Sequence, residues 1–281
     1  MGNQLIQLAY AESLARRAGV ELTVNPLLLG RAWARLRRNT YRRRSLLSEG
    51  SGRECQGLQT QLIHFFRLKV AMVRRQALLE TCSDAGCLEL LRSPKQRTRY
   101  LFGYFQRAEV FGLEARPFWL RLATRLKAAE PLAPYPADQV VVHVRLGDYL
   151  LPENQRLFAA LDLEDQILQA LAWREQLNGR SPIHIITDDP KGFERLCPRD
   201  LRSEVHLIAS GSAGADFRAL IRHRRIVGSN STFCLCAAQL AALLWQDNST
   251  LLLPRRWYVD QEMNQQQQKA LQGCRFTVSI S

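Results

Sequence analysis

The segment Val140–Val144 is the feature that most restricts what this chain can fold into. It holds four valines, interrupted only by His143. An unbroken β-branched run of this kind is typical of a strand buried on both faces, as strands are in parallel α/β sheets. We therefore predict a parallel sheet covered by helices on both sides.

Strand and helix patterns alternate regularly after this segment. The predicted strands lie at residues 183–186, 205–208, 225–227 and 250–253, and the predicted helices at 163–176, from 191, 216–222 and 232–245. This order predicts an α/β fold with a doubly wound parallel sheet in residues 136–281. Pro131, Pro134 and Pro136 indicate a linker, so we predict a separate N-terminal domain of residues 1–135.

The net charge of +13 is confined to the N-terminal half. Residues 1–130 contain 23 Lys and Arg against 10 Asp and Glu, whereas residues 131–281 contain 16 of each. Seven arginines lie in Arg31–Arg44. They predict either a solvated helical face or contact with an anionic partner, which is a membrane surface or a nucleic acid.

The seven cysteines are odd in number and have no CxxC spacing, which predicts reduced thiols and a cytoplasmic protein. The longest apolar stretch, Phe233–Trp245, contains Gln239 and is too short to span a bilayer. We therefore expect a soluble protein, with at most peripheral contact with the inner face of a membrane.

Polar residues gather where the first predicted strand ends. His143, Arg145, Gly147 and Asp148 occupy this end, where ligands of parallel sheets bind. Arg145 offers a fork of donors suited to phosphate. The alternative is an Arg145–Asp148 pair that only holds the loop together.

Two later strand ends also carry polar residues. The segment Gly228–Thr232 leads into an apolar helix, so it predicts either an anion site at the helix start or simple capping by Ser231 or Asn230. Asp188 and Asp189 follow another strand. Adjacent side chains at a strand end point apart, which favours capping over a metal site.

Five motifs, in order along the chain, resemble those of the α-1,2-fucosyltransferases, glycosyltransferase family 11. The segment from His143 to Tyr149 is similar to the family motif HxRxGDY. The other four motifs are GNQxFQYA, GYWQ, SDD and SNSTF, which correspond to Gly2–Tyr10, Gly103–Gln106, Thr187–Asp189 and Ser229–Phe233.

The resemblance implies a GT-B-like fold of two Rossmann-like domains. The C-terminal domain would bind GDP-β-L-fucose, and the N-terminal, acceptor-side domain would lack the family's first strand. The implied reaction is inverting transfer of L-fucose to the 2-hydroxyl of a galactoside, without metal or other cofactor. The acceptor would be a galactose-containing glycan, lipid-linked in a bacterial-type enzyme, and no nucleic acid would be bound.

The resemblance also assigns site residues. Its catalytic residues are Arg145, His143 and Asp148, and its donor-binding residues are Asp216, Ser229, Asn230, Ser231, Thr232, Asn3 and Gln4. Asp216 would accept hydrogen bonds from guanine. The sequence departs from the family at Leu146, where a second arginine is common, and at Phe105 and Cys234–Cys236, where the family has tryptophans.

Three other functions are consistent with parts of the sequence. A GDP-sugar transferase with another acceptor linkage would use the same donor residues. A protein that binds a GDP-sugar without turnover would keep the motifs and lose the reaction. A basic nucleic-acid-binding protein would account for the arginines, but it leaves the motifs in the C-terminal half, which has no net charge, unexplained.

Overall fold

The computed structural model describes residues 2–24, 53–54, 78–79, 83–93, 100–102, 104–129, 132–208, 211–246, 249–272, 274 and 277–280. The arginine-rich segment 31–44 lies outside these ranges, as do Gly103 and Pro131. The prediction of a basic contact surface at residues 31–44 therefore stays a prediction.

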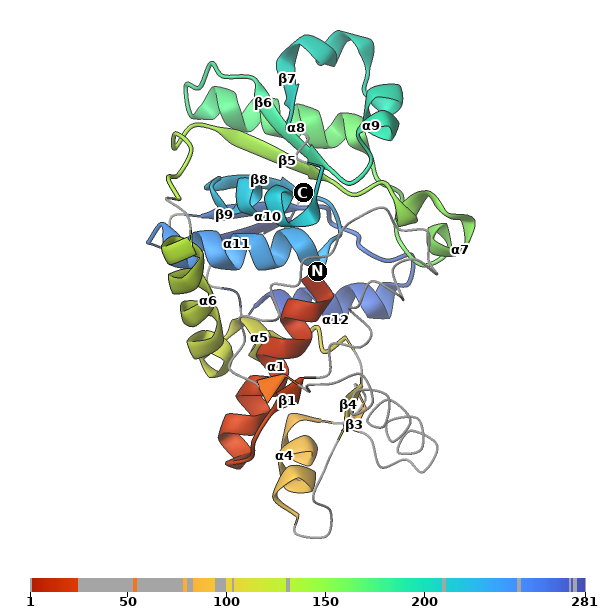
Figure 1. The fold of residues 1–281 in the computed structure, drawn as a ribbon. Coiled ribbons are helices and arrows are strands. Elements are labelled where there is room, and N and C mark those ends of the chain that lie inside the picture. The colour runs from red at the N-terminus through yellow and green to blue at the C-terminus, as the bar shows by residue number, and fades with distance from the viewer. Residues whose placement is uncertain are drawn as a thin grey trace.

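A parallel sheet of six strands forms the centre of the described chain (Figure 1). Its strand order is β10-β9-β8-β5-β6-β7, so the order reverses between β5 and β8. This confirms the predicted α/β class and the parallel, doubly wound sheet. The strands are β5 (Val140–Val144), β6 (Ile183–Thr187), β7 (Val205–Leu207), β8 (Arg225–Gly228), β9 (Thr250–Leu253) and β10 (Thr277–Ile280).

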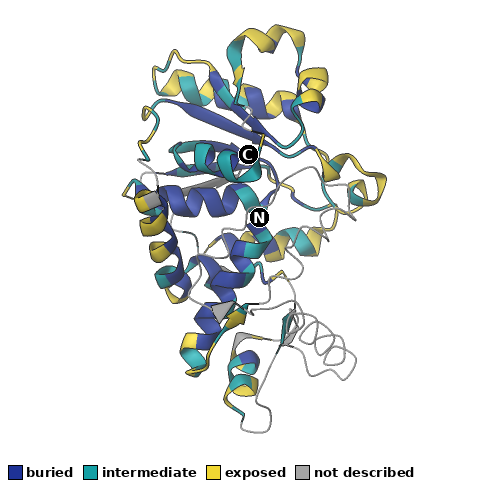
Figure 2. Cartoon of the chain, viewed as in Figure 1, coloured by how far each residue is buried: buried dark blue, intermediate teal, exposed yellow. Residues whose placement is uncertain are grey.

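All five residues of β5 are buried, as the valine run predicted. Figure 2 shows the central strands as the most completely buried part of the chain. Successive side chains of a strand point to opposite faces. Val140, Val142 and Val144 accordingly pack in one apolar cluster, and Val141 packs in another on the opposite face.

Helices cover both faces of the sheet. The helices α8 (Leu163–Gln176) and α9 (Pro190–Leu196) contribute to the first cluster, and α10 (Ala213–Ile221) and α11 (Thr232–Leu244) to the second. The predicted helix at 163–176 is confirmed. The predicted start at residue 216 is wrong, because Ser212 caps the helix one turn earlier by accepting a hydrogen bond from the backbone N–H of Ala215.

The last helix, α12 (Gln261–Leu271), and the strand β10 were not predicted from the sequence. Helix α12 has a strongly polar composition, and it starts at a cap formed by Asp260, whose side chain accepts from the N–H of Met263. The remaining elements of residues 104–281 are short. They are the helices α5 (Ala108–Phe111) and α7 (Pro152–Gln155) and the 3-10 turns Leu113–Ala115, Asp148–Leu150 and Arg199–Glu204.

The helices of the N-terminal half pack directly on the helix layer of the sheet. Helices α1 (Gly2–Ala18) and α6 (Arg116–Ala129) contact α11 and contribute Leu5 and Trp119 to its apolar cluster. The described N-terminal residues otherwise form helix α4 (Asp84–Arg92) and two parallel strand pairs. These pairs are β1 (Thr23–Val24) with β2 (Arg53–Glu54), and β3 (Leu78–Leu79) with β4 (Leu101–Phe102).

The boundary predicted between residues 135 and 136 is not tested by these contacts and stays a prediction. The five described cysteines are free thiols, and four of them are buried. Cys55 and Cys82 lie outside the described residues, so the prediction of reduced thiols throughout the chain stays a prediction.

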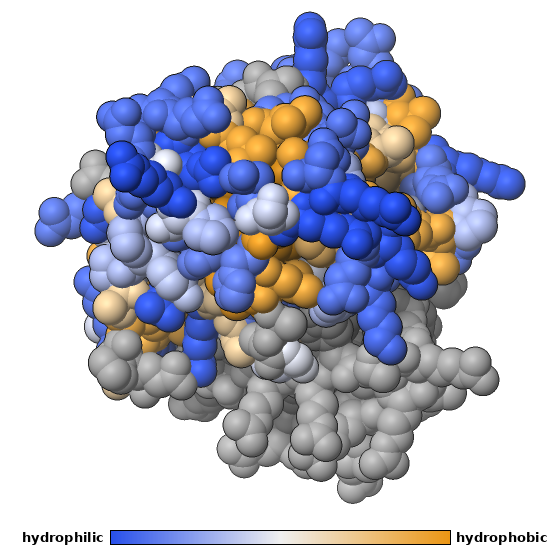
Figure 3. Space-filling model, turned by 90° about the horizontal axis from the view of Figure 1, so that it is seen from above, coloured by the Kyte–Doolittle hydropathy of each residue, from blue (hydrophilic) through white to orange (hydrophobic). Residues whose placement is uncertain are grey.

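The surface above the sheet is mostly hydrophilic. Figure 3 views the molecule from this side and shows apolar side chains lying between charged ones. Leu168 of α8 and Leu196 of α9 are among the exposed large apolar residues.

Candidate functional site

The turn after β5 is held in place by a carboxylate from the neighbouring strand. Oδ1 of Asp188, which follows β6, accepts hydrogen bonds from the backbone N–H of Leu146 at 2.9 Å and of Gly147 at 3.2 Å. A Cβ atom on residue 147 would lie 2.6 Å from Oδ2 of Asp188, so only glycine allows this approach without a shift. Asp188 thus fixes the path of the turn that carries Arg145.

Arg145 is paired with two carboxylates. Its Nε and Nη2 lie 2.9 Å and 2.7 Å from Oδ1 of Asp148, and Nε lies 3.3 Å from Oδ2 of Asp188. Burial alone would lower the pKa of Arg145, but the charges of Asp188 and Asp148 outweigh it and raise the pKa. The Arg145–Asp148 ion pair, which was the alternative role predicted for Arg145, is therefore present.

These ion pairs do not use the whole guanidinium. Nη1 of Arg145 has no partner among the described residues, and 32% of the side chain is exposed. The group can therefore still donate hydrogen bonds to an anion.

His143 lies beneath this turn, at the end of β5. Its Nδ1 is 3.2 Å from Oγ of Ser229, and its ring stacks on Phe233 with a centroid distance of 5.3 Å. Burial, followed by the charge of Arg145, lowers the pKa of His143 to about 3. The imidazole is therefore neutral at physiological pH, and it positions Ser229 as a hydrogen-bond partner.

The loop between β8 and α11 runs beside the β5 turn. Tyr149 donates a hydrogen bond from its hydroxyl to the carbonyl of Asn230, and the side-chain amide of Asn230 donates to the carbonyl of Trp257 at 2.9 Å. Oγ of Ser231 accepts from the N–H of Phe233 at 3.2 Å, which makes Ser231 the N-cap of α11. The capping role predicted for Ser231 is confirmed.

The start of α1 meets the start of α11. Oδ1 of Asn3 accepts a hydrogen bond from the hydroxyl of Thr232 at 2.7 Å, across 229 positions of the sequence, and a longer one from the side-chain amide of Gln106 at 3.4 Å. A Cβ atom on Gly2 would lie 2.4 to 2.6 Å from backbone atoms of Thr232 and Phe233. The N-termini of α1 and α11, which carry the positive ends of the helix dipoles, therefore lie next to each other.

The remaining donor-site candidates, Gln4 and Asp216, lie on α1 and α10. Gln4 follows Asn3 in α1 and is half-buried. Asp216 lies in the first turn of α10 and is only 4% exposed. Its neighbour Phe217 packs edge-on against Phe233, with ring centroids 5.1 Å apart. Asp216 is thus connected through Phe217 to the layer that supports His143.

The aspartates after β6 have separate roles. Oδ1 of Asp189 caps α9 by accepting from the N–H of Gly192 at 3.0 Å, as the sequence predicted. The role of Asp188 in the β5 turn was not predicted; the only signal for it was that its strand follows β5 in the chain. Within the described residues, no group of three or more His, Cys, Asp or Glu side chains could hold a metal ion.

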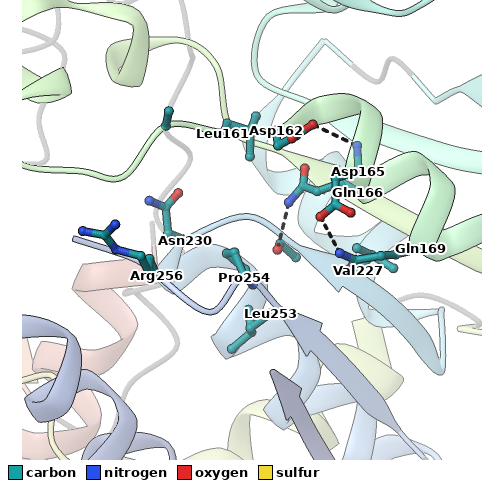
Figure 4. A pocket seen from close by; sticks show the side chains of 12 residues that line it. Leu161, Asp162, Asp165, Gln166, Gln169, Val227, Asn230, Leu253, Pro254 and Arg256 are labelled. Carbon is teal, nitrogen blue, oxygen red and sulfur yellow. Dashed lines mark hydrogen bonds between the residues drawn. The ribbon is translucent and has the colours of Figure 1, made fainter. Parts of the chain in front are cut away.

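A pocket lies at the same edge of the sheet, on the face covered by α8 (Figure 4). It has about 430 Å³ of empty space, including its open mouth. The first turns of α8 form one side, and Asn230 and Arg256 lie across from them. Its residues from the start of α8, among them Asp162, Asp165 and Gln166, were not predicted from the sequence to be site residues.

No protein-family model matches this chain, and a search of the curated proteins returns no match. None of the described helices combines the length and the apolar character needed to cross a membrane.

Proposed function

We propose that this protein is an inverting glycosyltransferase that moves L-fucose from GDP-β-L-fucose to the 2-hydroxyl of a galactoside. In this reaction the acceptor hydroxyl attacks C1 of fucose and loses its proton to a base. The bond from C1 to the β-phosphate oxygen breaks, and its electron pair stays on GDP.

The observation that carries the proposal is the meeting of three motif segments at one edge of the sheet. The β5 turn with Arg145, the loop before α11 with Ser229 and the start of α1 with Asn3 are far apart in sequence. They are joined by the hydrogen bond between His143 and Ser229 and by the one that Thr232 donates to Asn3. In doubly wound sheets, ligands bind where the strand order reverses, and here that point is between β5 and β8.

The charges at this edge suit a departing nucleotide diphosphate. Departure of GDP places negative charge on the β-phosphate, which fixed donors stabilise when they are already in position. Nη1 of Arg145 and the N-terminal end of α11 are two such sources. Asp216 would accept from guanine, His143 would position Ser229, and Asp148 would orient Arg145.

The proposed arrangement is GT-B-like, with residues 1–135 on the acceptor side and residues 136–281 binding the donor. The contact between α1 and α11 supports a donor site completed by the N-terminal half, because Asn3 reaches the loop that follows β8.

A transfer assay tests the proposal directly. The purified protein is incubated in EDTA with a panel of galactosides and with GDP-fucose, GDP-mannose or UDP-galactose. We expect a fucosylated galactoside from GDP-fucose alone. Activity that is lost in EDTA and restored by Mn²⁺ would contradict the metal-independent reaction. Absence of both transfer and GDP binding would overturn the whole assignment.

We further propose that the basic N-terminal half contacts an anionic membrane surface on the cytoplasmic side, where a lipid-linked acceptor would lie. Each basic residue near such a surface contributes roughly 1 kcal/mol. Binding to liposomes should then require acidic lipid and should weaken as salt rises through physiological strength. Equal binding to neutral liposomes would contradict this contact.

A further inference from the structure

The pocket on the α8 face has features of a ligand site, and of its lining residues only Asn230 also belongs to the proposed donor site. It is an open depression, and its space of about 430 Å³ includes the solvent at its mouth. The floor is apolar, and six polar side chains converge above it. The apolar residues include Val227, Leu253 and Pro254, and the polar ones are Asp162, Asp165, Gln166, Gln169, Asn230 and Arg256.

Two buried amide groups in this lining each leave an oxygen without a partner. Gln166 is 5% exposed and Asn230 is 3% exposed, and neither Oε1 of Gln166 nor Oδ1 of Asn230 has a hydrogen-bond partner. Their nitrogens are used, because Gln166 donates to the carbonyl of Gly228 at 3.1 Å and Asn230 to that of Trp257 at 2.9 Å. If either amide were rotated by 180°, its oxygen would face the backbone carbonyl that its nitrogen now contacts, and two acceptors would meet. The unpaired atoms are therefore the amide oxygens, which are acceptors.

The carboxylates at the start of α8 add further acceptors. Oδ1 of Asp162 caps the helix by accepting from the N–H of Asp165 at 2.9 Å, and Oδ2 of Asp165 accepts from the side-chain amide of Gln169. The second oxygen of each carboxylate has no partner among the described residues. These carboxylates are exposed and can accept from water, whereas the two buried amide oxygens cost free energy while they lack a donor. The site therefore favours a ligand that supplies donors to Gln166 and Asn230.

We propose that this pocket binds a neutral saccharide unit. Hydroxyl groups can donate to Gln166 and Asn230 and to the carboxylate of Asp165, and the C–H faces of a sugar ring suit the apolar floor. A phosphate would be repelled by Asp162 and Asp165. An ammonium ion would be attracted by the same two carboxylates, so choline is included in the experiment as a competing ligand.

This inference goes beyond the proposed transfer reaction, because it concerns equilibrium binding and needs neither GDP-fucose nor turnover. The transferase proposal can fail while the sugar site stands, and the reverse also holds. The two outcomes are separated by measuring sugar binding in the absence of nucleotide.

Isothermal titration calorimetry with galactose, L-fucose and glucose tests the site in the full-length protein. We expect at least one of these sugars to bind, and Asp165→Asn to weaken that sugar's binding by about tenfold or more, the usual effect of losing a hydrogen bond to a charged group. Glu164→Gln is the matched control. It also removes one carboxylate from the first turn of α8, but it lies outside the pocket, so its affinity should equal that of the wild type.

A folding check keeps the comparison interpretable. If circular dichroism shows that Asp165→Asn is unfolded, Gln169→Leu replaces it with the same expected loss. The proposal is overturned if none of the three sugars binds, or if Asp165→Asn and Glu164→Gln bind them equally well. It is also overturned if inorganic phosphate or choline binds in an Asp165-dependent manner while the sugars do not.

Discussion

Arg145 and Asp188 show how much one pair of residues determines at this site. The carboxylate of Asp188 accepts from two backbone N–H groups of the β5 turn and also lies 3.3 Å from the guanidinium of Arg145. Asp148 holds the same guanidinium from its own loop. The orientation of Arg145 is therefore set before any ligand arrives, which reduces the free energy needed to organise the site during a reaction.

Replacing Arg145 by lysine should lower the turnover of the proposed transfer by about 100-fold or more. An ammonium group is a point charge and cannot reproduce the planar fork that contacts Asp148, Asp188 and a phosphate at once. The measurement is the initial rate of fucose transfer at saturating GDP-fucose.

The control for this substitution is Arg156→Lys. Arg156 is an exposed residue at the end of α7, in the same connection between β5 and α8. Its replacement should leave the rate unchanged. If Arg145→Lys keeps more than about a third of the wild-type rate, Arg145 serves only to hold the loop.

At the scale of whole elements, the first residues of α1 and α11 approach each other closely. The backbone of Gly2 lies so near Thr232 and Phe233 that a side chain would meet main-chain atoms, which cannot move aside cheaply. The two helices also pack along their lengths in one apolar cluster. Glycine at this position therefore permits the docking that brings Asn3 to Thr232.

Gly2→Ala should destabilise the protein by about 1–3 kcal/mol, the usual cost of forcing extra atoms into a packed contact. The free energy of unfolding in urea gives the measurement. Gly214→Ala is the matched control, because a Cβ atom at this position in α10 would meet nothing within 4 Å. That change should be neutral or stabilising by up to about 1 kcal/mol. Equal effects of the two substitutions would show that α1 does not dock as described.

At the scale of the whole molecule, two buried histidines, His143 and His223, and the half-buried His184 connect its stability to pH. Burial is the largest cause in each case, and it lowers the pKa of His143 to about 3, of His184 to about 4 and of His223 to about 3. Nδ1 of His223 faces the carbonyl of Ala219 at 2.9 Å and must donate to it. Nε2 of His223 is therefore the acceptor for Nδ1 of His184, at 2.8 Å.

The free energy of unfolding should fall as the pH drops from 7 to 5. The unfolded chain takes up protons near pH 6.5 at histidines that stay neutral in the folded state until about pH 3 to 4. The stabilisation is complete above pH 6.5. As the pH falls below 6.5, each histidine lowers the free energy of unfolding by up to about 1.4 kcal/mol per pH unit. Urea unfolding at several pH values measures the slope. His223→Gln should make the slope shallower, and an unchanged slope would contradict this origin.

Much of the fold could be predicted from short stretches of sequence. The valine run predicted a strand buried on both faces, and β5 is buried throughout. The start of α11 at Ser231 and the capping by Asp189 followed from side chains that bond backbone groups two or three residues away. These features depend on periodicity and local hydrogen bonds, which a sequence displays directly.

The contacts that assemble the site could not be obtained in the same way. Asp188 reaches the β5 turn because β6 lies beside β5, and Asn3 reaches Thr232 because α1 packs on α11. The pocket beside α8 exists only once β8, β9 and α8 are placed together. By itself the sequence determined the local elements and the residue types at the strand ends. Which of those residues meet depends on strand order and helix packing over long separations in the chain, and only the tertiary structure decided that.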